Sequence, residues 1–173
     1  MNRHQRVLYF TKLVGSEGVH DKTFLDLLKC YYLPKKSSLR VEIKKGHGKA
    51  QTEIVRDVVR NPGAYDKKMA VMDNDKPSSE MALADELAEA NNVVVMRNTP
   101  CIEGVLIRIL EPKKKLGGMS SQQLKDYFEE HYIPEKKRTD LVTYKKVFPK
   151  ELLDEARKRE PELDAMIKVM EGK

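Results

Sequence analysis

The sequence has little cysteine, and what it has forms no pattern typical of a disulfide framework or a metal site. Only two of the 173 residues are cysteines, Cys30 and Cys101. No Cys-x-x-Cys or His-x-x-x-His spacing of the kind that holds zinc occurs. Small secreted proteins rely on several disulfides. We therefore expect both cysteines to be buried thiols and the protein to work in the cytoplasm.

The sequence also lacks a long hydrophobic run. A helix that crosses a bilayer needs about 20 apolar residues. The most apolar stretch, residues 105–110, is short and contains Arg108. Residues 1–6 lack the apolar segment of a secretory signal. We therefore expect no membrane-spanning segment and no membrane partner.

Charge, by contrast, is abundant. Charged residues make up 35% of the chain, the formal net charge is +6, and the isoelectric point is about 9.2. This excess favours an anionic partner, with nucleic acid ahead of an acidic membrane surface. A solvated, lysine-rich surface explains the same excess. Composition leaves both interpretations open.

Strand-like and helix-like stretches alternate through the first two thirds of the chain, which predicts βαβ units. We expect an α/β fold. Residues 1–111 would form an open sheet of about four mainly parallel strands flanked by helices, and residues 112–173 a basic helical extension packed on it. The expected strands are 7–10 or 7–13, 39–43, 68–72 and 93–96; the expected helices are 21–33, 50–60, 79–91, 102–110, 122–131 and 150–170.

Carboxylates follow the first and third of these strands. Glu17 follows the first strand, and Asp73 and Asp75 follow the third. The carboxyl ends of parallel strands form the edge where open α/β sheets bind ligands. Carboxylates that meet there need a hard cation, so we expect Glu17, Asp73 and Asp75 to hold Mg²⁺ or Mn²⁺. Asp21 either completes a second metal site or caps the next helix, and a plain polar turn remains the alternative for Asp73 and Asp75.

A glycine-containing turn before the helix of residues 50–60 is a second candidate site. A helix N-terminus exposes N–H groups that can hold phosphate. The turn is not a Walker A motif, because Ala50 stands where Ser or Thr is required. We expect either a solvated turn or phosphate contacts from three side chains, Lys45, His47 and Lys49.

Basic clusters continue in the C-terminal part, beginning with Lys113, Lys114 and Lys115. Lysines that contact phosphates, with tyrosines that stack on bases, suit single-stranded nucleic acid. The same tyrosines can equally be core residues. A single histidine in the first acidic motif, His20, either faces the same crevice as Glu17 and Asp21 or is incidental. The tyrosines interleaved with the basic clusters are Tyr127, Tyr132 and Tyr144.

Taken in order, these motifs resemble a known family. Glu-Gly followed by an acid after the first strand, with Asp-x-Asp after the third, resembles the Toprim domain of topoisomerases, primases and OLD-type nucleases. Residues 16–18, 46–48, 71–75 and 97–103 more closely resemble RloB-like proteins. The chain departs from the family pattern at Asp21, at the additional Thr99, and at two positions, 102 and 104, that lack the expected aromatic residue.

The resemblance covers residues 6–110 and implies a metal-dependent nuclease that acts in bacterial defence against phage or mobile elements. It implies four catalytic residues: Glu17, Asp73, Asp75 and Glu103. Glu103 would orient a metal-bound water or cap its helix. The alternative is a non-catalytic module that binds nucleic acid, DNA or RNA, or works with a separate ATPase or sensor subunit. A homo-oligomer is compatible with either interpretation. A third interpretation is a phosphoryl-transfer enzyme that acts on a nucleotide.

Overall fold

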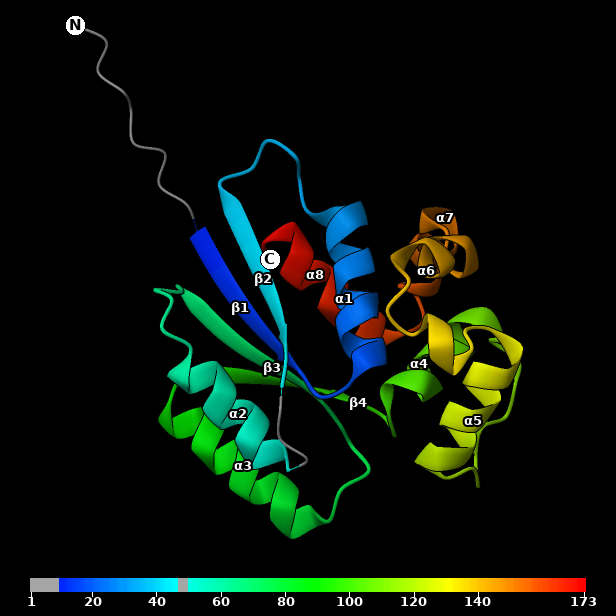
Figure 1. The fold of residues 1–173 in the computed structure, drawn as a ribbon, viewed down its shortest axis with the longest axis horizontal. Helices are drawn as coiled ribbons and strands as arrows, with labels where there is room; N and C mark the ends of the chain where they lie inside the picture. Colours follow the sequence, from blue (N-terminus) through cyan, green and yellow to red (C-terminus); the bar gives the residue numbers. More distant parts are fainter. Residues whose placement is uncertain (1–9, 47–49) are drawn as a thin grey trace, which may run out of the picture.

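Four parallel strands form one open sheet in the computed structural model, which describes residues 10–46 and 50–173 (Figure 1). The order is β2-β1-β3-β4, so β1 and β3 are the central pair. Every neighbouring pair is parallel. The predicted α/β class with about four mainly parallel strands is confirmed. The strands are β1 (Phe10–Ser16), β2 (Leu39–Lys45), β3 (Lys67–Asp73) and β4 (Val93–Asn98).

Helices cover both faces of this sheet. Helices α2 (Gln51–Arg60) and α3 (Ser78–Ala90) lie side by side on one face, and α1 (Val19–Tyr32) and α8 (Pro161–Glu171) on the other (Figure 1). No helix in the described part of the chain is both long and apolar enough to cross a bilayer. The other helices lie beside α1 and beyond the end of β4, on the right in Figure 1: α4 (Ile102–Leu110), α5 (Ser121–His131), the 3-10 turn η1 (Glu135–Lys137), α6 (Leu141–Val147) and α7 (Lys150–Ala156).

The central strands bury side chains on both faces, as parallel strands covered by helices do. In β3, Ala70 and Met72 belong to the smaller core beneath α2 and α3, whereas Met69 and Val71 belong to the larger core. That larger core also contains fully buried aromatic residues of α1 and the C-terminal helices: Phe24, Phe128, Tyr144 and Phe148. The sheet and the C-terminal helices therefore share one hydrophobic core.

Several element boundaries differ from the prediction. Strand β1 continues to Ser16, three residues beyond its farthest predicted end, while residues 7–9 lie outside the described ranges. Helix α1 begins at Val19, before the predicted start. The predicted helix of residues 150–170 is two helices, because Pro161 occupies the first turn of α8 and cannot continue the preceding helix.

The prediction that both cysteines are buried is wrong for Cys30. Cys101 is buried, but Cys30 is exposed near the end of α1. The helix buries the stripe that includes Leu27 and Leu28 against the sheet, and Cys30 falls on the solvent side of that stripe. Cys30 is therefore a chemically accessible thiol.

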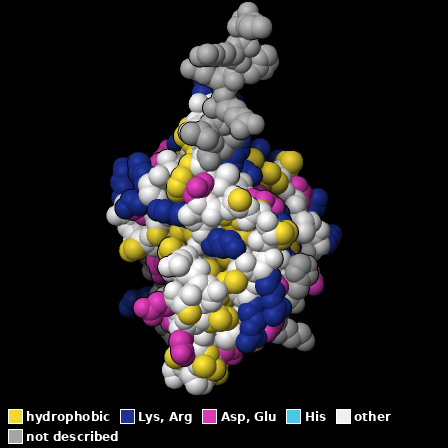
Figure 2. All heavy atoms as spheres, turned by 90° about the vertical axis from the view of Figure 1, so that its left-hand side faces the viewer, with side chains coloured by type: hydrophobic (Ala, Val, Ile, Leu, Met, Phe, Trp, Pro, Cys, Tyr) yellow, Lys and Arg dark blue, Asp and Glu magenta, His cyan; other side chains and the backbone are white. Residues whose placement is uncertain are grey.

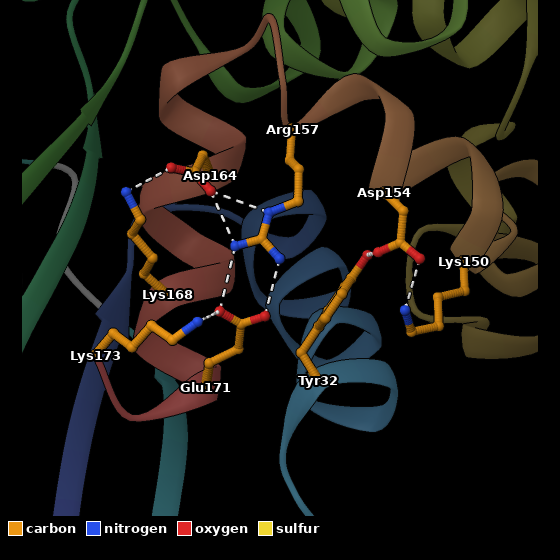
Figure 3. Close-up of polar contacts among 8 residues, drawn as sticks. All are labelled: Tyr32, Lys150, Asp154, Arg157, Asp164, Lys168, Glu171 and Lys173. Carbon is orange, nitrogen blue, oxygen red and sulfur yellow. Dashed lines mark hydrogen bonds and ion pairs between the residues drawn. The ribbon is translucent and has the colours of Figure 1, made fainter.

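A polar cluster fixes α7 and α8 to the end of α1 (Figure 3). The guanidinium of Arg157 donates to Asp164 Oδ1 over 3.0 Å and to Glu171 Oε1 over 2.8 Å. The hydroxyl of Tyr32 donates to Asp154 over 2.8 Å. Bidentate pairs between arginine and carboxylates are geometrically specific as well as strong. The cluster is completed by Lys150, Lys168 and Lys173, which pair with Asp154, Asp164 and Glu171 respectively.

Candidate active site

The two acidic motifs meet because β1 and β3 are neighbours. Ser16 is paired with Val71, so Glu17 lies beside the last residues of β3. The Glu17 N–H donates to the Val71 carbonyl over 3.2 Å. In return, Glu17 Oε2 accepts the N–H of Asp73 over 3.0 Å. The end of β1 is thereby tied to the end of β3, and their carboxylates share one sheet edge.

Asp73 connects this edge to α4. Its Oδ1 accepts the backbone N–H of Ile102 over 3.1 Å, at the first residue of the helix. A carboxylate at a helix N-terminus is favoured by the free N–H groups and by the helix dipole. The main-chain carbonyl of Asp73 accepts the side-chain amide of Gln51 over 2.6 Å. Asp73 is therefore held from both sides, and its side chain faces the start of α4.

Asp21 is almost completely buried, with 2% of its surface exposed. Its Oδ2 accepts the Gly18 N–H over 3.1 Å, in the manner of a helix cap. Its Oδ1 accepts the side-chain amide of Asn98 over 3.3 Å. Lys22 does not compete for this carboxylate, because it pairs with Asp26 over 2.6 Å. Asp21 caps the helix and still contributes to the acidic cavity.

These side chains line a cavity of about 260 Å³. Glu103, 7% exposed, enters it from the first turn of α4. Two cations from the C-terminal helical part, Lys125 and Arg138, lie in the same lining. Five carboxylates therefore face a single cavity: Glu17, Asp21, Asp73, Asp75 and Glu103.

Burial and mutual repulsion disfavour the ionised form of the carboxyls in this cavity. Burial, and then the neighbouring carboxylates of Asp21 and Glu17, raise the pKa of Asp73 to about 9. Burial, followed by Glu103 and Glu17, raises the pKa of Asp21 to about 8. Carboxyls crowded in this way need a proton or a cation.

Lys76 supplies part of the compensating charge. Its ammonium lies 3.4 Å from Glu17 Oε1 and 3.7 Å from Asp75 Oδ1. Burial disfavours the charged form of Lys76, but the carboxylates of Glu17 and Asp75 outweigh that effect and raise its pKa. One lysine cannot neutralise five carboxylates. An ion bound at the cavity would compete with Lys76 for Glu17.

The donor set suits a hard divalent cation, since Mg²⁺ and Mn²⁺ prefer carboxylate oxygens. Within residues 10–46 and 50–173, however, no group of three or more His, Cys, Asp or Glu side chains is already gathered tightly enough to hold an ion. Glu17 Oε2 and Asp73 Oδ1 instead accept backbone N–H groups. An ion would have to draw the carboxylates together by side-chain rotation.

Sequence reasoning missed a buried network beside the cavity. His20 lines the cavity, is 3% exposed, and lies in the first turn of α1. Its Nδ1 is hydrogen-bonded to the Tyr144 hydroxyl, and its Nε2 lies 3.0 Å from Glu129. Glu129 also accepts Arg138 Nε over 2.6 Å. Burial lowers the pKa of His20, although hydrogen bonding to Glu129 and the charge of Glu103 oppose this. Tyr144 is fully buried, which excludes base stacking by its ring.

The predicted basic residues that the structure describes are not part of the acidic cavity's lining. Lys45 is exposed at the end of β2 and lines a neighbouring groove. Lys114 is paired with Glu111 and lies over the Tyr127 ring, while Lys113 and Lys115 are exposed. The predictions for His47 and Lys49 fall on residues outside the described ranges. The cations in the cavity lining are instead Arg138, from the C-terminal basic cluster of residues 136–138, and Lys125, which no sequence motif indicated.

The face drawn in Figure 2 carries separate groups of Lys and Arg side chains with Asp and Glu among them, rather than one basic patch. Charge density on this face therefore does not single out a binding surface.

Comparisons with protein-family models, with curated proteins and with solved structures find no match to this chain. Its function is therefore argued from the geometry and charge of its own site.

Proposed function

We propose that the protein is a Mg²⁺- or Mn²⁺-dependent nuclease that cleaves phosphodiester bonds in nucleic acid. The observation that carries this proposal is the convergence of five carboxylates on one cavity at the ends of β1 and β3. The resemblance of its motifs to Toprim and RloB-like proteins supports the same function. The proposal includes a cytoplasmic role in defence against phage or mobile elements.

Each part of the site has a task in this proposal. Glu17, Asp73 and Asp75 would hold the metal, with Asp21 as an additional ligand. A bound ion supplies charge stabilisation and an activated water in phosphoryl chemistry. Lys125 and Arg138, which lie in the cavity lining, bind the phosphate and orient it towards the carboxylates. Glu103 accepts a proton or a hydrogen bond at the cavity wall.

A second candidate is a module that binds nucleic acid, or an ATPase or sensor partner, without cleavage. One observation favours it: Glu17, Asp21 and Asp73 each accept a backbone N–H, so part of the acidic cluster has a structural task already. Salt-sensitive binding without turnover would distinguish this module from a nuclease.

The test is cleavage of DNA, RNA and tRNA by the purified protein with Mg²⁺, with Mn²⁺ and with chelator. The test variant is Glu17→Gln with Asp73→Asn, which keeps side-chain size and hydrogen-bond acceptors. The control is Glu86→Gln with Glu89→Gln, which removes two exposed charges from α3. We expect metal-dependent cleavage by the wild type and the control, and none by the test variant. Cleavage by the test variant at the wild-type rate would remove both residues from the mechanism.

A further inference from the structure

A second hollow, of about 710 Å³, runs along α1 next to the acidic cavity. One stripe of α1 forms its wall, with positions three, four and seven residues apart on the same helical face. From Val19 to Leu33 this stripe extends about 20 Å along the helix axis. The α1 residues in the lining are Val19, Lys22, Thr23, Asp26, Lys29 and Cys30, with Leu33 at the helix end.

The groove is strongly basic. Asp26 is the one acid in its lining, and that carboxylate is paired with Lys22 over 2.6 Å. The cations come from three separate segments, α1, the loop after it and β2, so they surround the hollow rather than project from one side. Among the residues that the structure describes, the cationic side chains of the lining are Lys22, Lys29, Lys35, Arg40 and Lys45. Such an arrangement suits a ligand that carries several negative charges in a row.

The basic groove adjoins the acidic cavity. Val19, the first residue of α1, lines both hollows. A ligand that lies along α1 would therefore reach the carboxylates of Glu17 and Asp21 at the N-terminal end of the helix. The two hollows together form a path with cations along its length and an acidic cluster at its end.

The floor of the groove is apolar between the cations. Val19, Leu33, Pro34 and Leu141 belong to the lining. A duplex keeps its bases stacked and presents phosphates, whereas an unpaired strand can place bases against an apolar surface. No aromatic ring is part of this lining, so base contacts would be made without strong stacking and with little sequence preference.

We propose that the groove binds a single-stranded segment of the nucleic-acid substrate and leads it over Val19 into the acidic cavity. Phosphates contact Lys29, Lys35 and Lys45, and bases lie against the apolar floor. This inference rests on the proposed nuclease function for the role of the acidic cavity, but the binding it describes is independent of cleavage.

Cys30 provides a direct test, because it is the exposed cysteine and lines the groove, whereas Cys101 is buried. The full chain is treated with N-ethylmaleimide in chelator, with and without short oligo-dT, oligo-U or a DNA duplex. Modification is followed by intact mass, and Cys30→Ser identifies the reacting thiol. Binding is measured in parallel by the fluorescence anisotropy of labelled oligonucleotides.

We expect saturating single strand to slow alkylation of Cys30 markedly, and duplex to slow it less. Unchanged Cys30 reactivity while a single strand is bound would overturn the groove assignment, and so would the absence of any binding. Metal-dependent cleavage with an unprotected Cys30 would refute the groove alone. Protection of Cys30 without cleavage under any metal condition would refute the nuclease alone.

Charge removal gives a second test. Lys29→Gln with Lys35→Gln should weaken single-strand binding about tenfold. It should also reduce the slope of log affinity against log salt by about 1.4, the value for two lost phosphate contacts on a single strand. The matched control is Lys67→Gln with Lys158→Gln, two exposed lysines outside both hollows. Equal weakening in the control would overturn the proposed path.

Discussion

Neutralising Asp73 should stabilise the metal-free protein at neutral pH while removing the proposed nuclease activity. Its pKa is raised from 3.8 to about 9 by burial and by the charges of Asp21 and Glu17. In the unfolded chain the Asp73 carboxyl ionises near pH 3.8. Folding at pH 7 therefore requires this carboxyl to take up a proton. Each pH unit of that difference costs about 1.4 kcal/mol. The penalty therefore grows as pH rises from 3.8 towards 9.

At pH 7 the whole shift corresponds to about 4 kcal/mol. Because the charges of Asp21 and Glu17 contribute to the raised pKa of Asp73, this free energy is shared among the carboxyls of the cavity. We assign about half of this free energy to Asp73, and therefore expect Asp73→Asn to raise the free energy of unfolding by about 2 kcal/mol. Asparagine keeps an oxygen for the Ile102 N–H, now 3.1 Å from Asp73 Oδ1.

The assay is urea unfolding of wild type and Asp73→Asn in chelator at pH 5, 7 and 8. The advantage of the variant should grow with pH, whereas Asp126→Asn, at an exposed position of α5, should show no such trend. Saturating Mg²⁺ or Mn²⁺ should stabilise the wild type more than the variant, since a ligand stabilises the state that binds it. A variant that is less stable than the wild type at all three pH values would refute the reasoning.

The remaining predictions concern the C-terminal helices. Arg157→Met should lower the free energy of unfolding by about 2 kcal/mol, because Asp164 and Glu171 lose their shared partner; Lys158→Met, at an exposed position, should change it little. The bond to Arg157 lowers the pKa of Glu171 from 4.5 to about 2, so this stabilisation is complete above pH 4.5 and is lost as pH falls towards 2. Acid unfolding of the wild type and of Glu171→Gln measures this pH-dependent stabilisation. Identical unfolding curves for the two proteins would contradict the prediction. Lys12 is buried and donates to the Val169 carbonyl over 3.1 Å. Lys12→Met should cost about 1 kcal/mol in urea unfolding, and an unchanged midpoint would exclude this role.

The sheet was predictable from the sequence because parallel strands buried on both faces appear as apolar runs. The strand ends were not. Gly15 and Ser16 carry no strand-like side chain, yet they continue β1 because β2 and β3 pair with them on both sides. Arg97 and Asn98 extend β4 past its apolar residues in the same way, through pairing with Met72 and Asp73. Pairing partners, rather than local propensity, set these boundaries.

The acidic half of the site was predictable for a related reason. Glu17 directly follows β1 and Asp73 is the last residue of β3, and topology alone brings the ends of adjacent parallel strands together. The basic half was predictable only in part: Arg138 belongs to a basic cluster, residues 136–138, but the density of positive charge in a segment does not indicate which side chains face a cavity. The lysine triplet drew attention, whereas Lys125 stands alone in an amphipathic helix and carries no comparable signal.

The His20 network depends on contacts between residues more than 100 positions apart, which no local pattern reveals. It also explains how the C-terminal helices contribute to the site. Glu129 joins His20 of α1 to Arg138, which lines the acidic cavity. The carboxylates come from the sheet and the helices that follow its strands, while Lys125 and Arg138 come from the C-terminal helical part. The proposed binding of a nucleic-acid phosphate beside the acidic cluster would require both, so in this proposal the packing of the C-terminal helices on α1 serves the site as well as the fold.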